Sequence, residues 1–245
     1  MKKYLFSYHA IEGALRKGVV NGTLLITQKK DRYNHLIKLA KNKGVPVVYT
    51  NQKELDIYCN KDKHRGVLLL FENISEPIKK NLLDYLMKLN NKNNLILLLD
   101  CITDPHNFGA ILRSADQFNV DLVITTQRRS ASQSPVVSIT SAGTDMFVNQ
   151  ITVNNLARTI DLLKEKGFWI YGADIKGTYI DQISLCDNNI AIVFGSEGKG
   201  MRRLVKEKCD MLIKIPSSGN IDSFNVSVAA GILMYEVRRQ QGFWR

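Results

Sequence analysis

Short apolar runs alternate with amphipathic stretches along the first 73 residues. Apolar side chains at helical spacing predict helices that end near Gly18 and Gly44, and short runs rich in leucine and valine predict strands. The pattern predicts helices at 7–18, 33–44 and 53–59 and strands at 22–28, 45–50 and 66–72. We therefore expect residues 1–73 to form a compact α/β domain.

A second, longer α/β pattern begins at LILLLD (95–100), a near-continuous apolar run typical of a buried parallel strand. Strands and helices then alternate to the end of the chain, which predicts a mostly parallel sheet covered on both faces in a domain of residues 95–245. The expected strands are 95–100, 121–126, 168–174, 189–195 and 211–216, and the expected helices are 109–118, 155–167, 199–209 and 226–239. Residues 74–94 begin with a segment that can form a helix, and their asparagine-rich end indicates a linker.

Three polar loops follow strands of this second pattern. They lie within Asp100–Phe118, Ile192–Val205 and Ile215–Gln240, and each is rich in glycine, asparagine, serine or acidic residues. Ligands of parallel sheets bind at the carboxyl ends of the strands. The three loops therefore predict one built site at that edge of the sheet.

The positive charge of the chain is concentrated in its first third. The net charge is +11; residues 1–73 carry 14 lysines and arginines against six acidic residues, whereas residues 94–245 carry 16 against 15. The first domain is therefore either a lysine-rich solvated surface or a binding surface for a polyanion such as nucleic acid. Charge alone does not choose between the two.

Cysteine usage and hydropathy narrow the class of protein. The four cysteines lie far apart without a CxxC pair or a histidine at metal-ligand spacing, so we expect free thiols in a reducing cytoplasm and no metal site. No apolar run approaches the roughly 20 residues of a membrane span, and the N-terminus lacks the apolar core of a signal peptide. We expect a cytoplasmic protein without membrane contact.

The motifs DPHNFGAILRSAD, FGSEGKG and IPSSGNIDSFNVSVAAG, in this order and spacing, resemble those of the SpoU/TrmH family of RNA ribose 2′-O-methyltransferases. The resemblance covers roughly residues 95–245 and implies an α/β-knot methyltransferase domain with a deep trefoil knot and S-adenosylmethionine as cofactor. Residues 1–73 resemble the L30e-like substrate-binding domain of the ribosomal RNA branch. That likeness implies methylation of a guanosine ribose in large-subunit (23S) rRNA. Periodicity alone predicts an ordinary open sheet.

The resemblance assigns catalytic roles to five residues. Methyl transfer to a ribose hydroxyl requires an aligned acceptor oxygen, removal of its proton and a fixed flanking phosphate, and positioning supplies much of the barrier. The matching residues are Asn107, Arg113, Glu197, Ser223 and Asn225. Without the resemblance, the asparagines read as helix N-caps, Ser223 as a loop residue and Glu197 as a solvated turn acid.

Arg113 matches the family arginine that is proposed to activate the ribose hydroxyl, and the match places Glu197 beside it. By itself it reads as a surface arginine that pairs with Asp116. A guanidinium stays protonated in ordinary surroundings. Arg113 is therefore either the base in a strongly perturbed site or a group that orients the 2′-hydroxyl and the 3′-phosphate.

Cofactor contacts in the family are largely made by the backbone, where glycines allow close approach. The residues expected to contact the cofactor are Thr125, Thr126, Gly195, Ser196, Gly198, Ile215, Ser223, Phe224 and Asn225. Phe224 stands where the family commonly has leucine, and Ser217 where it has methionine. The larger Phe224 side chain is expected to alter the fit of the site more than its chemistry.

Further residues are expected to bind RNA or a second subunit. His64, Arg65, Arg128 and Arg129 are candidate RNA contacts; the competing interpretations are a turn histidine with satisfied hydrogen bonds and a solvated arginine pair. The family is dimeric through its terminal helix. The apolar residues that predict a homodimer here are Val228, Ile232, Leu233, Tyr235, Phe243 and Trp244.

Two other functions fit the same sequence. One is methylation of tRNA, against which the L30e-like first domain counts. The other is a non-catalytic RNA-binding or ribosome-assembly protein, against which the presence of all five matching catalytic residues counts.

Overall fold

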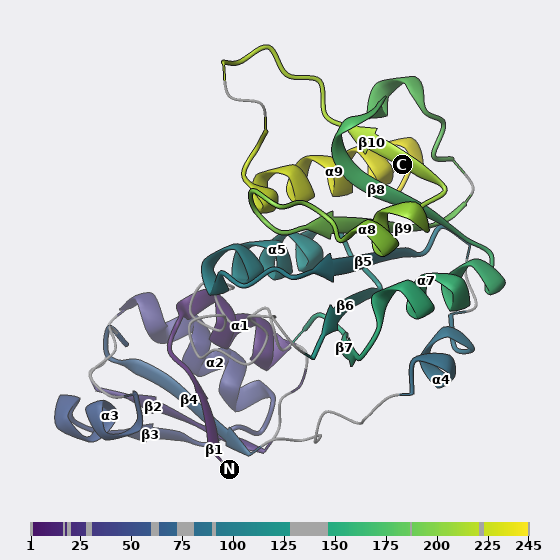
Figure 1. Ribbon diagram of the computed structural model, residues 1–245. Coiled ribbons are helices and arrows are strands. Elements are labelled where there is room, and N and C mark those ends of the chain that lie inside the picture. The colour runs from purple at the N-terminus through teal and green to yellow at the C-terminus, as the bar shows by residue number, and fades with distance from the viewer. Residues whose placement is uncertain are drawn as a thin grey trace. The chain divides into compact units, whose positions relative to one another are not determined.

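The structure is a computed structural model that describes residues 2–16, 18, 21–27, 31–59, 64–72, 81–89, 92–127, 147–186, 188–220 and 223–244. The described residues form two compact units, one within residues 1–78 and the other from residue 79 onward. Each unit is described by itself (Figure 1).

The first unit is built on a four-stranded sheet in the order β1 (Lys2–Leu5), β4 (Val67–Glu72), β2 (Gly22–Ile26) and β3 (Val47–Tyr49). β4 is antiparallel to both β1 and β2, and β3 is parallel to β2. The helices are α1 (Tyr8–Arg16), α2 (Asn34–Asn42) and α3 (Gln52–Cys59), all where the sequence pattern predicts them. β1 was not expected, since four residues are too few to show a period of two.

Both faces of this sheet are apolar. Leu25 and Leu68 pack against Leu55 and Cys59 of α3. Successive side chains of a strand point to opposite faces, so the fully buried Leu24 lies on the other side. α1 packs against α2 and β4, and α2 also packs against β3. The expected compact α/β unit is confirmed.

The second unit contains a six-stranded sheet in which every neighbouring pair is parallel. Its order is β10 (Met211–Lys214), β8 (Phe168–Tyr179), β9 (Asn189–Gly195), β5 (Leu95–Asp100), β6 (Leu122–Thr126) and β7 (Gln150–Val153). The expected parallel sheet is therefore confirmed. β7 was not expected, and β8 runs five residues beyond its expected end at residue 174.

Alternate residues of β5 separate the two faces of this sheet. Leu95, Leu97 and Leu99 pack against α5 (Pro105–Gln117) and α9 (Val226–Gln240). Ile96 and Leu98 pack in a second cluster with α4 (Leu82–Leu86), α7 (Leu156–Glu165) and α8 (Arg203–Glu207). Helices thus cover both faces, as Figure 1 shows for α5 and α7. Complete burial of one leucine contributes on the order of 2 kcal/mol.

Two expected boundaries are wrong. α5 begins at Pro105 rather than Gly109, because the Asp104 side chain caps it by accepting a hydrogen bond from the His106 amide. Asn107 is therefore a residue of the first turn and not an N-cap. The expected linker 74–94 is too long, because Leu82 and Leu86 of α4 are buried in the second unit.

Candidate active site

The first two polar loops begin side by side. Asp100 at the end of β5 lies opposite Gly195 at the end of β9 in the parallel register. The chain after Gly195 folds back on itself, with Ser196 and Gly200 exchanging backbone hydrogen bonds of 3.1 and 2.8 Å. A Cβ atom on Gly195 would lie 2.2 Å from the Gly200 carbonyl carbon. Only glycine fits here, and the close neighbour is this chain's own backbone.

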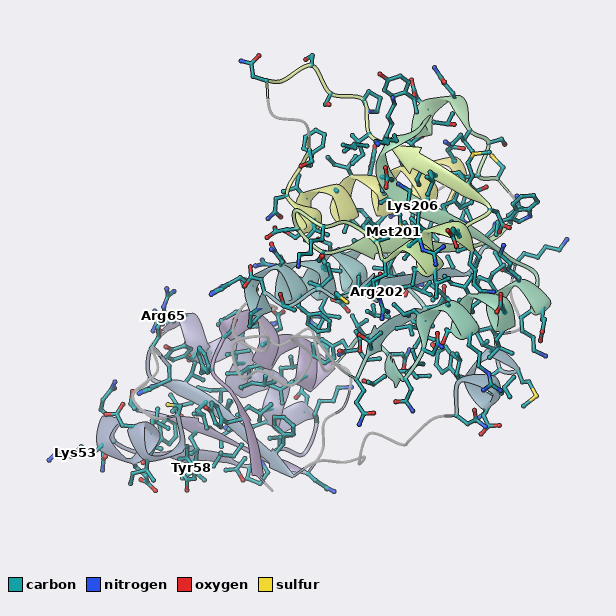
Figure 2. All side chains as sticks on the ribbon, viewed as in Figure 1. Lys53, Tyr58, Arg65, Met201, Arg202 and Lys206 are labelled. Carbon is teal, nitrogen blue, oxygen red and sulfur yellow. The ribbon has the colours of Figure 1, made fainter. Side chains whose placement is uncertain are left out.

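A buried carboxylate holds the far end of the second loop. Asp100 is fully buried and accepts hydrogen bonds from the Arg202 amide at 2.8 Å and from its Nε at 2.7 Å. The Arg202 Nη2 atom completes an ion pair at 2.7 Å. Arg202, labelled in Figure 2, therefore ties residues 196–202 to the end of β5. The sequence pattern does not predict this clamp, because the two residues lie 102 positions apart.

Three site residues from three different loops meet in one hydrogen-bonded group. The Glu197 Oε1 atom accepts from Asn107 Nδ2 at 2.8 Å and from Asn225 Nδ2 at 2.7 Å. Asn225 Nδ2 also donates to Asn107 Oδ1 at 3.0 Å. We call Asn107, Glu197 and Asn225 the polar junction. Asn107 is buried in it, whereas Glu197 and Asn225 face solvent.

Asn225 also begins the last helix. Its Oδ1 atom accepts from the Ser227 amide at 2.9 Å and from the Ser227 hydroxyl at 2.6 Å, so it is the N-cap of α9. The capping role and the site role that the sequence suggested for this residue therefore coexist. The cap fixes the amide in the direction of Glu197.

Arg113 does not join the polar junction. It lies exposed on α5, and within the described ranges its guanidinium makes no ion pair with Glu197, Asp116 or another carboxylate. The expectation that Glu197 orients Arg113 is therefore wrong for this chain alone, because both amide partners of Glu197 come from asparagines. As far as the described residues go, the Arg113 side chain is therefore available to a partner from outside.

A cavity of about 840 Å³ opens beside the polar junction, at the carboxyl ends of β8, β9 and β10. Its wall includes seven of the residues expected to contact a cofactor, namely Gly195, Ser196, Gly198, Ile215, Ser223, Phe224 and Asn225. Glu197 lines it as well. Two of the three loops thus enclose one space.

Thr125 and Thr126 do not line this cavity. They are buried in β6, which β5 separates from β9, and the Thr125 hydroxyl lies 3.4 Å from that of Thr152. The cavity wall instead contains a segment that the sequence analysis missed, Ala173–Lys176 with Tyr179 of β8, together with Lys206 and Lys214. The strand order explains the error, because β8 and not β6 lies between β9 and β10.

His64 is a turn histidine rather than a surface contact. Its side chain is 2% exposed; Nδ1 accepts from the Gly66 amide at 3.0 Å, and Nε2 lies 3.1 Å from Asp56 Oδ1. The ring is occupied inside the first unit, so its assignment to RNA is corrected.

Arg65 keeps the position expected of an RNA contact. Its side chain is exposed and points away from the unit in Figure 2. Its carbonyl accepts from Arg32 Nη2 at 2.8 Å and from the Tyr33 hydroxyl at 2.5 Å, which fixes the turn. Arg128 and Arg129, the other two expected contacts, lie outside the described residues.

The remaining features concern the cysteines, metal-ligating groups and membrane-spanning helices. The four cysteines are free thiols. In the described parts of the chain, no group of three metal-ligating side chains is found. No helix in those parts is long and apolar enough to cross a membrane.

Comparison with known families gives the class of the protein. The model of the SpoU rRNA Methylase family matches residues 94–235, and a model described as RNA 2′-O ribose methyltransferase substrate binding matches residues 4–77. The chain belongs to the SpoU methylase family, which confirms the resemblance drawn from the three motifs.

Individual relatives cover nearly the whole chain. An uncharacterized tRNA/rRNA methyltransferase of Borreliella burgdorferi is 49% identical over 88% of this chain and 97% of its own. The 23S rRNA (guanosine-2′-O-)-methyltransferase RlmB of Coxiella burnetii is 40% identical over 98% of this chain and 96% of its own. An AdoMet-bound rRNA methyltransferase of Sinorhizobium meliloti shares the fold, with a TM-score of 0.74 at 20% identity over 97% of this chain and 87% of its own.

Proposed function

We propose that this protein transfers a methyl group from S-adenosylmethionine to the ribose 2′-hydroxyl of a guanosine in large-subunit (23S) rRNA. The observation that carries the proposal is the polar junction of Asn107, Glu197 and Asn225 at the edge of the 840 Å³ cavity. The relative named RlmB, aligned over 98% of this chain, supports the choice of substrate.

The cavity fits this cofactor in size and lining. About 840 Å³ lies within the usual range of small-ligand pockets, roughly 300–1,000 Å³. Gly198 leaves backbone exposed for polar contacts, whereas Ile215 and Phe224 offer apolar walls for an adenine. S-adenosylmethionine supplies, when bound, an electrophilic methyl group on a sulfonium.

The residues around the cavity then have distinct tasks. The polar junction fixes the rim against which the ribose lies, because each of its members holds the other two. Ser223 lines the cavity next to that rim. Arg113 stands outside the junction as an exposed cation that orients the 2′-hydroxyl and the 3′-phosphate or accepts the proton.

The first unit serves to hold the RNA. Its sequence carries the excess of lysine and arginine, and the family model that matches it is a substrate-binding one. Arg65 is its exposed candidate contact. We infer an L30e-like role for this unit, and phosphate contacts of this kind make affinity fall with salt.

We also infer that the second unit carries the deep trefoil knot of its family and works in the cytoplasm. Membership of the SpoU methylase family supports the knot, because the matching family model covers residues 94–235 of this unit. Four free thiols support a reducing compartment.

Methyl transfer to separate transcripts tests the function. Labelled methyl groups from S-adenosylmethionine are expected in 23S rRNA, at a ribose that becomes resistant to alkali, and not in tRNA. Arg113→Ala is expected to lower the rate by about 100-fold or more, because the acceptor loses its positioning group. Arg158→Ala, which removes an exposed arginine of α7, is the matched control and should keep the wild-type rate.

Two other outcomes of the methyl-transfer assay would indicate a different function. Label in tRNA alone would assign the tRNA activity. Binding of S-adenosylmethionine without label in any RNA, including pre-ribosomal particles, would leave a non-catalytic RNA-binding protein.

We further propose that the protein is a homodimer through one face of α9. Val228, Tyr235, Phe243 and Trp244 are between 42% and 53% exposed, and the rings of Tyr235 and Trp244 stack at 5.6 Å. Leu233, also expected at this interface, is instead buried in the core. Light scattering at micromolar concentration should give twice the chain mass, and Tyr235→Glu should give a monomer. A monomeric wild-type protein would contradict the proposal.

A further inference from the structure

The cavity wall is rich in lysine beyond what the polar junction requires. Four lysines line it, at positions 176, 199, 206 and 214, against two acidic residues, Asp174 and Glu197. None of these lysines belongs to the residues expected from the sequence. Lysines in the wall of a small-ligand cavity can bind an anionic group of the ligand.

An irregularity between β8 and β10 builds this part of the wall. The two strands pair in parallel, but the register shifts between Leu212, opposite Gly172, and Ile213, opposite Thr178. Five residues of β8, Ala173–Gly177, are therefore accommodated opposite a single step of β10. This excursion brings Asp174 and Lys176 to the cavity.

Two of the lysines are held in contrasting ways. Lys206 Nζ lies 2.5 Å from Asp174 Oδ2, so its charge is neutralised (Figure 2 labels Lys206). Burial raises the pKa of Asp174, but the hydrogen bonds from Lys206 and from the Lys176 amide, together with the charges of both lysines, outweigh it and hold that pKa below the ordinary value. Lys214 lies beside Tyr179 in the register, with Nζ 4.1 Å from the centre of its ring.

Among the residues that the structure describes, Lys214 is thus a cation without an acidic partner. Its side chain is half-buried, and no carboxylate within the described ranges pairs with it. The face of a tyrosine ring attracts an ammonium group but leaves its N–H donors available. A fixed ammonium in a concave wall is suited to bind an anionic group of the ligand.

We propose that Lys214, held by Tyr179, forms an anion-binding subsite of this cavity that takes one carboxylate or phosphate group of a reactant. The inference rests on the proposed methyl transfer and names two sources for this group. One is the carboxylate of the methionine part of the cofactor. The other is a backbone phosphate of the RNA.

Two product-like ligands separate the sources. S-adenosylhomocysteine and 5′-methylthioadenosine are both adenosine thioethers, but only the first carries the amino-acid carboxylate. In calorimetric titration of the full-length protein, Lys214→Met is expected to weaken the binding of S-adenosylhomocysteine about tenfold. The affinity for 5′-methylthioadenosine should stay unchanged. Lys214→Arg keeps the charge and should restore most of the affinity. Lys166→Met, which removes the exposed lysine at the C-cap of α7, is the control.

The second arm of the test measures the KM for RNA and its dependence on salt. If S-adenosylhomocysteine binds Lys214→Met as it binds the wild type, the KM for RNA should rise and its salt dependence should become shallower, which assigns the subsite to a phosphate. Equal weakening of both thioethers, or no change in any of these quantities, would overturn the proposal. Tyr179→Leu leaves Lys214 in place and should produce a smaller loss of the same kind, so a misfolded Lys214→Met protein would not end the test.

The test also separates this inference from the proposed function. Titration with the thioethers requires no RNA and no turnover. A wild-type protein that binds S-adenosylhomocysteine but labels no RNA would contradict the proposed function, and the carboxylate arm would still decide the role of Lys214.

Discussion

Asn225→Asp is expected to lower the rate of methyl transfer at neutral pH by about 100-fold while the protein stays folded. The substitution keeps the size of the side chain and the oxygen that caps α9, since aspartate is as good an N-cap as asparagine. It replaces the amide that donates to Glu197 at 2.7 Å with a second carboxylate. Two carboxylates at this distance repel each other and disrupt the polar junction.

Repulsion between the two carboxylates also makes the rate of Asn225→Asp depend on pH, which a loss of structure would not do. Two adjacent carboxyl groups do not both ionise easily, so one of them retains its proton at a higher pH than an isolated acid. The protonated group again donates a hydrogen bond. The rate of Asn225→Asp relative to the wild type should therefore recover in part as the pH is lowered from 8 to 5.5.

The same substitution at another helix N-cap separates the effect of the new charge on the polar junction from any effect on capping. Asn155 is the N-cap of α7 and accepts from the Arg158 amide at 3.2 Å, far from the polar junction in sequence. Asn155→Asp should keep the wild-type rate at every pH. An Asn225→Asp protein with the wild-type rate at neutral pH would show that methyl transfer does not require the polar junction. A loss that is equal at all pH values would exclude repulsion as its cause.

The sequence predicted the framework of the site because that framework depends on local patterns. Residues 95–99 of this run are apolar at every position, as only a strand buried on both faces requires, and β5 has both faces covered. Alternating helices and strands make a sheet parallel, and in a parallel sheet the loops after β5, β9 and β10 must share one edge. The location of the cavity follows from these facts.

Pairings across the sheet could not be predicted in this way. Thr125 and Lys214 both lie at or near strand ends, yet only Lys214 lines the cavity, because the order of the strands places β10 and not β6 beside β8. The Asp100–Arg202 clamp and the contact of Asn107 with Glu197 join residues 102 and 90 positions apart. Only the family motifs placed Asn107, Glu197 and Asn225 together beforehand, and the structure brings these three into contact.

Two adjacent arginines illustrate the same limit. Arg238 and Arg239 are adjacent in the sequence near the end of the last helix, and no local pattern distinguishes them. In the structure the side chain of Arg238 is 2% exposed, whereas Arg239 is exposed and pairs with Glu236 at 2.7 Å. Which of the two turns inward depends on the carbonyl groups that the end of α5 and the start of β5 present to α9.

Arg238→Met is expected to reduce the free energy of unfolding of the second unit by about 3 kcal/mol or more. The guanidinium donates to the carbonyls of Phe118 at 2.9 Å, Asn119 at 2.5 Å and Asn93 at 2.7 Å, which joins α9 to the end of α5 and to the chain before β5. Burial lowers the pKa of Arg238, so keeping this charge in the core has a cost that the acceptors offset. Methionine replaces the aliphatic stem of the arginine but leaves those carbonyls without donors.

Urea denaturation followed by tryptophan fluorescence measures this loss selectively. The chain has two tryptophans, Trp169 on β8 and Trp244 after α9, and both belong to the second unit. The midpoint should fall for Arg238→Met with an unchanged slope. Arg239→Met should behave as the wild type, because its ion pair is exposed. Equal midpoints for the two variants would contradict the anchoring role, since the comparison holds the residue type and the helix constant and changes only burial.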